Sequence, residues 1–535
     1  MTGAYLTSLL AAIVALALLA KRMHVPYPVV FVIGGLAIAL VPGVPTVELE
    51  PDLVFLLFLP PLIFGDGWTT DYRSFVRYRR PIFALALGLV VCTSIAVGYV
   101  AHWMIGVPLA VGFVLGGILS PTDAVATDAI AEEVDLPRRI TSIVSGESLI
   151  NDASGLVIYR FALAAVATGA FSLAFAFVQF LYVVAAGVAI GLGGGWLIAK
   201  MMIAIRKKGL SDQLIAVSIS LVTPFALYVP ADAIGGSGVL AALTGGIYLS
   251  RKSTQIFDAD SRLAAASVWN LLFFIFNGAA FVLIGLQLRA IVHQLPEYSL
   301  PLLIGWGLAV WVVLVAVRFA WVYTVALVSW GWFPVLRSGE GTPPTWQALC
   351  VLSLAGMRGI VSLAAALAVP ELLPFTETPF PDRALILFIT FVVILVSLVG
   401  EGLLLPVVIR WFDGSLGSEE DSERALALAR ARTAAAARDH LRSLEPTFET
   451  PAEWEIAGRL QAEYDDREAH FRAHADGAAP EDDAQQHVIE RRLRAEAHGA
   501  ERRALLDLRR AGEIGDDVYR SLEWDLDLAE SRLTS

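Results

Sequence analysis

The sequence GESLINDASG, residues 146–155, lies within an apolar segment covering residues 140–168. It places Glu147, Asn151 and Asp152 among residues that otherwise suit a lipid bilayer. A carboxylate near the middle of a membrane is costly unless it is paired, hydrated or bound to a cation, so such residues mark ion or proton pathways. The stretch therefore predicts a membrane-spanning helix that carries an ion or proton site.

The composition of the whole chain also indicates a membrane protein. Hydrophobic residues make up 56% of the 535 residues and charged residues only 17%, whereas charged residues make up about 25% of a soluble protein. A run of about 20 apolar residues spans a bilayer as a helix. The predicted spans are residues 4–20, 27–43, 51–68, 81–103, 107–131, 140–168, 172–203, 211–229, 235–250, 265–291, 300–328, 345–370 and 383–411. We predict an all-α polytopic membrane protein with about thirteen transmembrane helices.

Basic residues in the predicted loops fix an orientation. They follow the odd-numbered spans, whereas loops after even-numbered spans, such as PGVPTVELEP, have almost none. Loops rich in Lys and Arg stay in the cytoplasm, which places the N-terminus outside and the C-terminus inside. The basic positions are 21–22, 73–80, 138–139, 206–208, 251–252 and 337. The expected location is the plasma (inner) membrane.

The C-terminal tail differs from the rest of the chain. From residue 415 onward it holds 28 acidic residues and 17 arginines, a charge of −11 out of −12 for the chain. Its apolar residues recur at loose helical spacing. We predict a transmembrane domain over residues 1–412 and a helical cytoplasmic domain over residues 413–535, which either regulates transport or aids assembly. No nucleic-acid-binding pattern is present.

Two spans contain signals for a broken helix. In LSPTDAVATDAI, residues 119–130, Pro121 removes a backbone donor and disrupts the preceding turn. Thr122 and Asp123 stand at this break, where they either bind an ion or only cap a half-helix. In LAGMRGIVSLAAALAVP, residues 354–370, two glycines flank Arg358. Interrupted helices in both halves of a chain indicate a transporter's site, and we expect spans 5 and 12 to be counterparts in an inverted repeat.

The polar residues of these segments suit hard cations and protons. Ser148 and Asp152 are four residues apart and share a helix face. The predicted cation- and proton-binding set is Asp152, Asn151, Asp123, Thr122 and Ser148, with Asp152, Asp123 and Ser148 as the metal ligands. A buried guanidinium needs a carboxylate, so we expect a structural ion pair between Glu147 and Arg358, with proton transfer through Glu147 as the alternative.

Two further acids are open to more than one interpretation. Asp66, in LPPLIFGDGWTTD, lies near the cytoplasmic end of span 3 and either lines an access funnel or stands in water beside the membrane. Glu401, in SLVGEGLLLP of span 13, either gates the inner mouth of the funnel or extends from the helix end to water.

Three motifs, SPTDAVA, GESLINDASG and GMRGIVSLA, resemble those of bacterial sodium/proton antiporters of the NhaP-like branch of the cation:proton antiporters. The resemblance covers about residues 5–412. It implies that Asp152 binds the cation and the proton, that Asn151 marks an electroneutral branch, and that the protein is a homodimer. Two departures are Asp66, one place after Gly65 where relatives have an acid, and Glu401, where the family often has Gln.

The resulting hypothesis is exchange of sodium, with lithium or potassium as further candidates, for protons by alternating access at Asp152. The transported ions are the only ligands expected, without a cofactor. A cation-coupled solute symporter is the alternative. No HExxH, GxSxG or nucleotide-binding motif indicates an enzyme.

Overall fold

The computed structural model describes residues 2–42, 56–125, 127–129, 136–169, 173–210, 212–292, 295, 297–331, 344–373, 378–412, 420–476, 481–511, 518, 522–523 and 526. These residues are almost entirely helical, with one isolated β-bridge between Leu372 and Pro379. The chain divides into two compact units, Met1–Gly417 and Ser418–Ser535. The predicted boundary at residues 412–413 stays a prediction, because residues 413–419 lie outside the described part.

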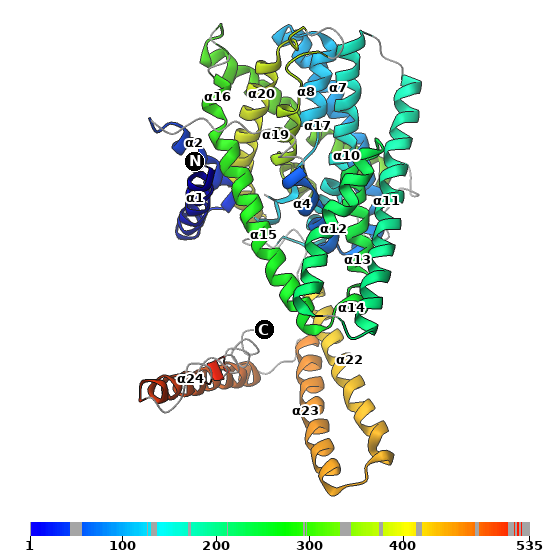
Figure 1. Ribbon diagram of the computed structural model, residues 1–535, viewed down its shortest axis with the longest axis vertical. Helices are drawn as coiled ribbons and strands as arrows, with labels where there is room; N and C mark the ends of the chain where they lie inside the picture. Colours follow the sequence, from blue (N-terminus) through cyan, green and yellow to red (C-terminus); the bar gives the residue numbers. More distant parts are fainter. Residues whose placement is uncertain are drawn as a thin grey trace. The chain divides into compact units, whose positions relative to one another are not determined.

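The helices of the first unit follow the predicted apolar runs (Figure 1). The first are α1 (Thr2–Met23), α2 (Tyr27–Ala39), α4 (Leu59–Thr69), α5 (Tyr72–Arg77), α6 (Arg79–Phe83), η1 (Ala84–Leu89), α7 (Val90–Val100), η2 (Ala101–Ile105) and α8 (Leu109–Leu119). Next come α10 (Arg138–Thr168), α11 (Leu173–Lys207), α12 (Gln213–Ala233), α13 (Gly238–Ser250), α14 (Ser253–Ile256), α15 (Ala259–Leu286) and α16 (Leu288–Val292). The last are α17 (Leu300–Gly331), α18 (Trp346–Leu354), α19 (Ile360–Leu367), α20 (Arg383–Val396), η4 (Ser397–Glu401) and α21 (Gly402–Trp411).

The membrane character of this unit agrees with the sequence. Among the described residues, seven helical stretches are long and apolar enough to cross a membrane, and three shorter apolar helices accompany them. The prediction of an all-α, multi-pass membrane protein is confirmed. The count of thirteen spans stays a prediction, because the start of the span at residues 51–68 and the loop around residue 337 lie outside the described residues.

Two hydrophobic clusters organise the unit. The larger cluster includes residues of α8, α17 and α20, and the smaller one includes residues of α4, α11, α12 and α13. Helix α10 contributes to both, with Val144 in the larger cluster and Leu149 and Ala153 in the smaller one. The helix with the GESLINDASG stretch therefore lies where the two clusters meet, as expected for a site between two helix bundles.

The second unit contains α22 (Glu420–Leu444), η5 (Glu445–Thr447), α23 (Pro451–Ala475) and α24 (Glu481–Arg510). Helices α22 and α23 pack side by side as a hairpin (Figure 1). Arg438 of α22 donates to the carboxylates of Asp465 and Glu468 on α23, at 2.8 and 2.5 Å. These ion pairs and a capping box at Thr450 stabilise the hairpin.

Candidate ion-binding site

The first predicted interruption is present. Helix α8 ends at Leu119, and the chain passes through Pro121, Thr122 and Asp123 without helical structure before helical residues resume at 124. The ring of Pro121 packs against Gly155 of α10, where an added Cβ would lie 2.4 Å from the proline Cγ. This glycine lets the broken segment approach α10 closely. The prediction of a broken span 5 is confirmed.

The second interruption is also present, and the two breaks touch. Helix α18 ends at Leu354 and α19 begins at Ile360. The backbone N–H of Asp123 donates to the carbonyl of Met357 at 2.7 Å. A Cβ on Gly359 would lie 1.6 Å from Asp123 Oδ2, so any larger residue there would displace the Asp123 side chain. The prediction of a broken span 12 is confirmed, whereas the inverted repeat stays a prediction.

Asp123 and Ser148 partly serve as helix caps. The N–H of Val125 donates to Asp123 Oδ1 at 2.9 Å, and the N–H of Ala124 donates to Ser148 Oγ at 3.2 Å. The other carboxylate oxygen of Asp123, Oδ2, is buried and has no hydrogen-bond partner among the described residues. A buried oxygen in this state gains most from a proton or a cation. Capping alone therefore does not account for Asp123.

Of the two acids of α10, Asp152 lacks the hydrogen-bond donors that Glu147 has. Its side chain is 8% exposed, and no group in the described part of the chain donates a hydrogen bond to its carboxylate. The carboxylates of Asp123 and Asp66 are close enough to interact with it electrostatically. A buried anion near other acids is unstable until a proton or a cation neutralises it. This arrangement suits a group that binds and releases ions.

Asn151 and Thr122 connect this site to Glu147. The side-chain amide of Asn151 donates to the hydroxyl and the carbonyl of Thr122, at 2.8 and 3.2 Å. The hydroxyl of Thr122 donates in turn to Glu147 Oε1 at 3.1 Å. The amide oxygen of Asn151 is buried without a partner among the described residues. Asn151 therefore fixes the break and also leaves one oxygen available for a ligand.

The predicted ion pair between Glu147 and Arg358 is wrong. Glu147 pairs with Arg318 of α17 in a fork, with Nη1–Oε1 at 2.5 Å and Nη2–Oε2 at 2.8 Å, and both side chains are 1% exposed. Arg318 also donates to the carbonyl of Leu352. The sequence interpretation missed Arg318, although a lone arginine inside a 32-residue apolar helix is itself a signal of a buried ion pair.

Arg358 instead binds backbone carbonyls at both breaks. Its Nε donates to the carbonyl of Leu119 at 3.3 Å, and its Nη1 donates to the carbonyl of Gly356 at 2.6 Å. Leu119 is the last residue of α8 and Gly356 follows the end of α18 by two residues, so these carbonyls lack helical partners and a cation is favoured there. Backbone carbonyls therefore accept the hydrogen bonds of the Arg358 guanidinium that the sequence prediction directs to Glu147.

Glu401 does not extend to water from a helix end, whereas its predicted role at the inner mouth of an access funnel stays a prediction. Its side chain is 2% exposed, and Trp311 Nε1 donates to its Oε1 at 2.7 Å. It belongs to the π-helical turn η4, buried against α17. The indole N–H and nearby arginine charge make burial of this acid tolerable, so it need not reach water.

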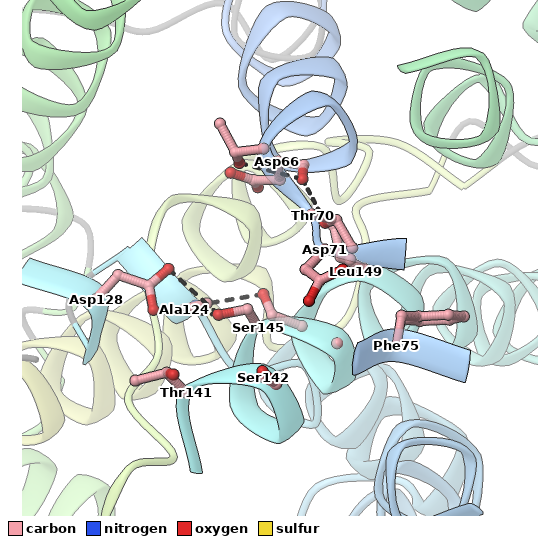
Figure 2. A pocket seen from close by; sticks show the side chains of 13 residues that line it. Asp66, Thr70, Asp71, Phe75, Ala124, Asp128, Thr141, Ser142, Ser145 and Leu149 are labelled. Atoms are coloured by element: carbon pink, nitrogen blue, oxygen red, sulfur yellow. Dashed lines mark hydrogen bonds between the residues drawn. The ribbon is translucent and has the colours of Figure 1, made fainter. Parts of the chain in front are cut away.

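A cavity of about 290 Å³ lies beside the site (Figure 2). Asp66 lies in its wall, and Ser145 of α10 donates to Asp128 Oδ1 at 3.1 Å across it. The lining extends from Asp71 and Thr141 to Ser148, one helical turn before Asp152. The set of site residues predicted from sequence does not include Asp128, although it follows Asp123 by five residues in LSPTDAVATDAI.

Asp71 adds a fixed negative charge to this wall, outside the membrane-spanning segments. Ser74 Oγ donates to Asp71 Oδ2 at 2.6 Å, and the N–H of Arg73 donates to Oδ1 at 2.9 Å. The bond from Ser74 is the largest cause that lowers the pKa of this carboxyl below its usual value. The cavity wall is therefore acidic from Asp71 inward.

Comparison with known proteins identifies the family. Residues 8–411 match the family model described as the transmembrane part of sodium/hydrogen exchangers. The chain belongs to the sodium/hydrogen exchanger family. The exchanger is 35% identical over 499 residues to the uncharacterised Na⁺/H⁺ exchanger YjcE of Escherichia coli, covering 91% of this chain and 90% of that protein.

A second relative and a solved structure agree with this assignment. The exchanger is 38% identical over 392 residues to the sodium, potassium, lithium and rubidium/H⁺ antiporter of Bacillus subtilis, covering 72% of this chain and 58% of that protein. Its fold matches the sodium/proton antiporter MjNhaP1 of Methanocaldococcus jannaschii, with a TM-score of 0.60, 19% identity, and coverage of 78% and 99% of the two chains. The exchanger is a cation:proton antiporter.

Proposed function

We propose that Asp152 binds the transported cation and the proton in turn, and that the exchanger changes access only when this carboxylate is neutralised. The observation that carries the proposal is the state of Asp152. It is buried, has acidic neighbours, and receives no hydrogen bond within the described residues. Moving the Asp152 carboxylate through the low-dielectric interior without a bound ion has a high free-energy cost. The exchanger therefore rarely changes access with an unoccupied site, and import of one ion is coupled to export of the other.

The donor atoms at the site support an alkali cation as the ligand. Asp152, Asp123 and Ser148 supply hard oxygen atoms, and the buried Oδ2 of Asp123 has no other partner among the described residues. The described residues contain no group of three or more His, Cys, Asp or Glu side chains placed to hold a metal ion. Such a sparse set suits a cation bound weakly in transit. We propose sodium as the main cation, with lithium and potassium also accepted.

We propose that the cavity is the cytoplasmic entrance to Asp152. Its outer lining residues, Asp71 and Thr141, lie beside the loops that the distribution of basic residues places in the cytoplasm. In this orientation the N-terminus is outside, the C-terminal unit is cytoplasmic, and the exchanger lies in the plasma membrane. One cation would be exchanged for one proton, because a single carboxylate accepts either.

We further propose that the exchanger works as a homodimer surrounded by lipid. Large apolar side chains are exposed along α11 and α12, including Phe177, Trp196, Leu214 and Val222. Such a surface needs lipid or a second copy of the chain to cover it. The names of the relatives denote cation:proton exchange rather than cation-coupled solute symport.

The test is the Asp152→Asn substitution, assayed in everted membrane vesicles by the proton movement that follows a pulse of sodium, lithium or potassium chloride. We expect exchange to be lost by at least about a hundredfold with unchanged expression, because the neutral amide can take neither charge. The matched control is Asp260→Asn, which makes the same change at an exposed position in the first turn of α15. Retained cation-driven proton flux in the Asp152→Asn protein would contradict the proposal.

A further inference from the structure

The fork between Arg318 and Glu147 leaves Arg358 without a carboxylate contact. Arg358 is 2% exposed, and no carboxylate in the described part of the chain lies within ion-pair distance of it. Backbone carbonyls at the two breaks fill hydrogen-bonding positions of its guanidinium, but they carry no net charge. A buried guanidinium with only neutral partners is costly, because desolvation of the charge is not offset. A negative group must therefore act on Arg358 from nearby.

Glu401 is the remaining buried acid with the right surroundings. The only hydrogen bond that its carboxylate receives from the described residues is the one from Trp311, which is neutral. The charged groups that interact with Glu401 are Arg358 and Arg318, and Arg318 is already forked to Glu147. Three other helices in the described part of the chain pack against η4: α2 carries no Asp, Glu, His, Lys or Arg, and α20 and α21 carry only Arg383 and Arg410, each at the end of its helix away from η4. Arg358 is thus the cation left for Glu401.

The π-helical turn η4 contacts Arg358 at a second point. The backbone N–H of Arg358 donates to Ser397 Oγ at 3.1 Å, and Ser397 is the first residue of this turn. The turn therefore binds the backbone of Arg358 at one end and presents Glu401 at the other. Single π-helical turns inside α-helices are frequent at functional sites. The segment is built to hold both the position and the charge of Arg358.

We propose that Glu401 is the counter-charge of Arg358 and a positioning residue of the exchange reaction. Trp311 orients the carboxylate, the carboxylate neutralises Arg358, and Arg358 joins the ends of the two broken helices beside Asp123. This inference rests on the proposed role of Asp152. Without Glu401, an uncompensated positive charge would stand next to the ion site. That charge would weaken the binding of both protons and cations to Asp152.

The test is Glu401→Gln, which keeps the shape and removes the charge. We expect the pH profile of sodium/proton exchange to move toward acid by about half a pH unit. At pH values above the midpoint of that profile, the KM for sodium should rise about threefold, because a nearby positive charge disfavours binding of both ions to Asp152. Glu401→Asp should restore the wild-type profile. The matched control is Glu371→Gln, at an exposed side chain outside the membrane. An unchanged profile in Glu401→Gln would overturn the proposal.

A double-mutant cycle keeps the inference testable if the single variant folds poorly. Arg358→Gln and Glu401→Gln together remove both charges, so the double variant should be thermally more stable in detergent than either single variant. Strictly additive losses of stability would refute the pairing of these charges. This measurement does not use transport, so it separates failure of the pairing from failure of the role proposed for Asp152.

Discussion

Two buried polar clusters meet at α10, which contributes Glu147 to one and Asp152 to the other, and they differ in how their charges are satisfied. The closed cluster comprises Glu147, Arg318, Arg358 and Glu401, in which negative and positive groups are equal in number. The open cluster comprises Asp123 and Asp152, which have no cationic contact among the described residues and lie close to an acidic cavity. Thr122 and Asn151 connect the two clusters through hydrogen bonds.

Helix α10 thereby combines a rigid charge cluster with a site for ion exchange. The balance of charges makes the closed cluster stable only as a unit, because removing one charged group leaves another buried without compensation. The open cluster keeps a carboxylate without partners, so an incoming ion finds a group that its charge stabilises. Mutations should therefore damage stability at the first cluster and transport at the second.

The largest expected effect is loss of stability when the closed cluster is broken. Arg318→Gln leaves Glu147 buried without its fork and should destabilise the protein by about 3–5 kcal/mol. The measurement is the yield of folded protein in membranes and its thermal melting in detergent. Normal folding of Arg318→Gln with loss of transport alone would contradict a structural role for this ion pair.

The next effect concerns the contact between the two breaks. Gly359→Ala would force the added Cβ against the carboxylate of Asp123, and we expect exchange to fall at least about tenfold, because misplacing a site group by about 1 Å can cost a hundredfold. The assay is sodium-driven proton movement in everted vesicles. Gly305→Ala is the matched control, since its new Cβ would meet no atom within 4 Å. Equal activities for the two variants would exclude a role for this close contact.

A smaller effect is expected in the cavity wall. Ser145→Ala removes the hydrogen bond to Asp128, and such a bond to a charged group contributes about 1.5–3 kcal/mol when it is buried. The bond is only partly buried, so we expect about a threefold change in the KM for sodium and little change in kcat. A change in kcat alone would place Ser145 outside the entrance pathway.

The smallest effect on the protein is expected for Glu453, an acid that is exposed to water, unlike the buried acids of the two clusters. The N–H groups of Thr450 and Glu449 donate to Glu453 at 2.7 and 2.8 Å and lower its pKa below the usual 4.5. A lowered pKa means that the ionised form stabilises the first turn of α23. This contribution is present above pH 4.5 and is lost as the pH falls through the lowered pKa.

Glu453→Gln should therefore reduce amide protection only in the first turn of α23 at neutral pH, without altering exchange. Hydrogen exchange on the full-length protein, corrected for intrinsic rates, measures this change. In the wild type the same protection should fall on acidification, whereas in Glu453→Gln it should not. A pH-independent wild type would rule out the carboxylate as its source.

The positions of the breaks could be predicted from sequence because each has a local cause. Pro121 removes a donor, and the glycines on either side of Arg358 weaken the helix there, so both signals act within a few residues. The described structure has its interruptions at these places. Asp152 also stands out locally, since an acid in an apolar run is costly wherever the helix lies.

The partners of the buried charges could not be predicted in the same way. Glu147 pairs with Arg318 of α17 rather than with Arg358, which lies 40 positions later in the break between α18 and α19. Hydropathy gives the depth of a residue but not the neighbour that it faces. The sequence likewise placed Glu401 in the membrane but could not show that an indole and a π-helical turn hold it in the interior.

Trp311 and Arg318 both stand on α17, seven residues apart, and each binds an acid from another helix. Seven residues make almost two full turns, so the two side chains point the same way. Inserting or deleting one residue between them would turn one side chain by about 100° relative to the other. The exchanger should therefore tolerate volume-conserving apolar substitutions in residues 312–317 better than any change in their number.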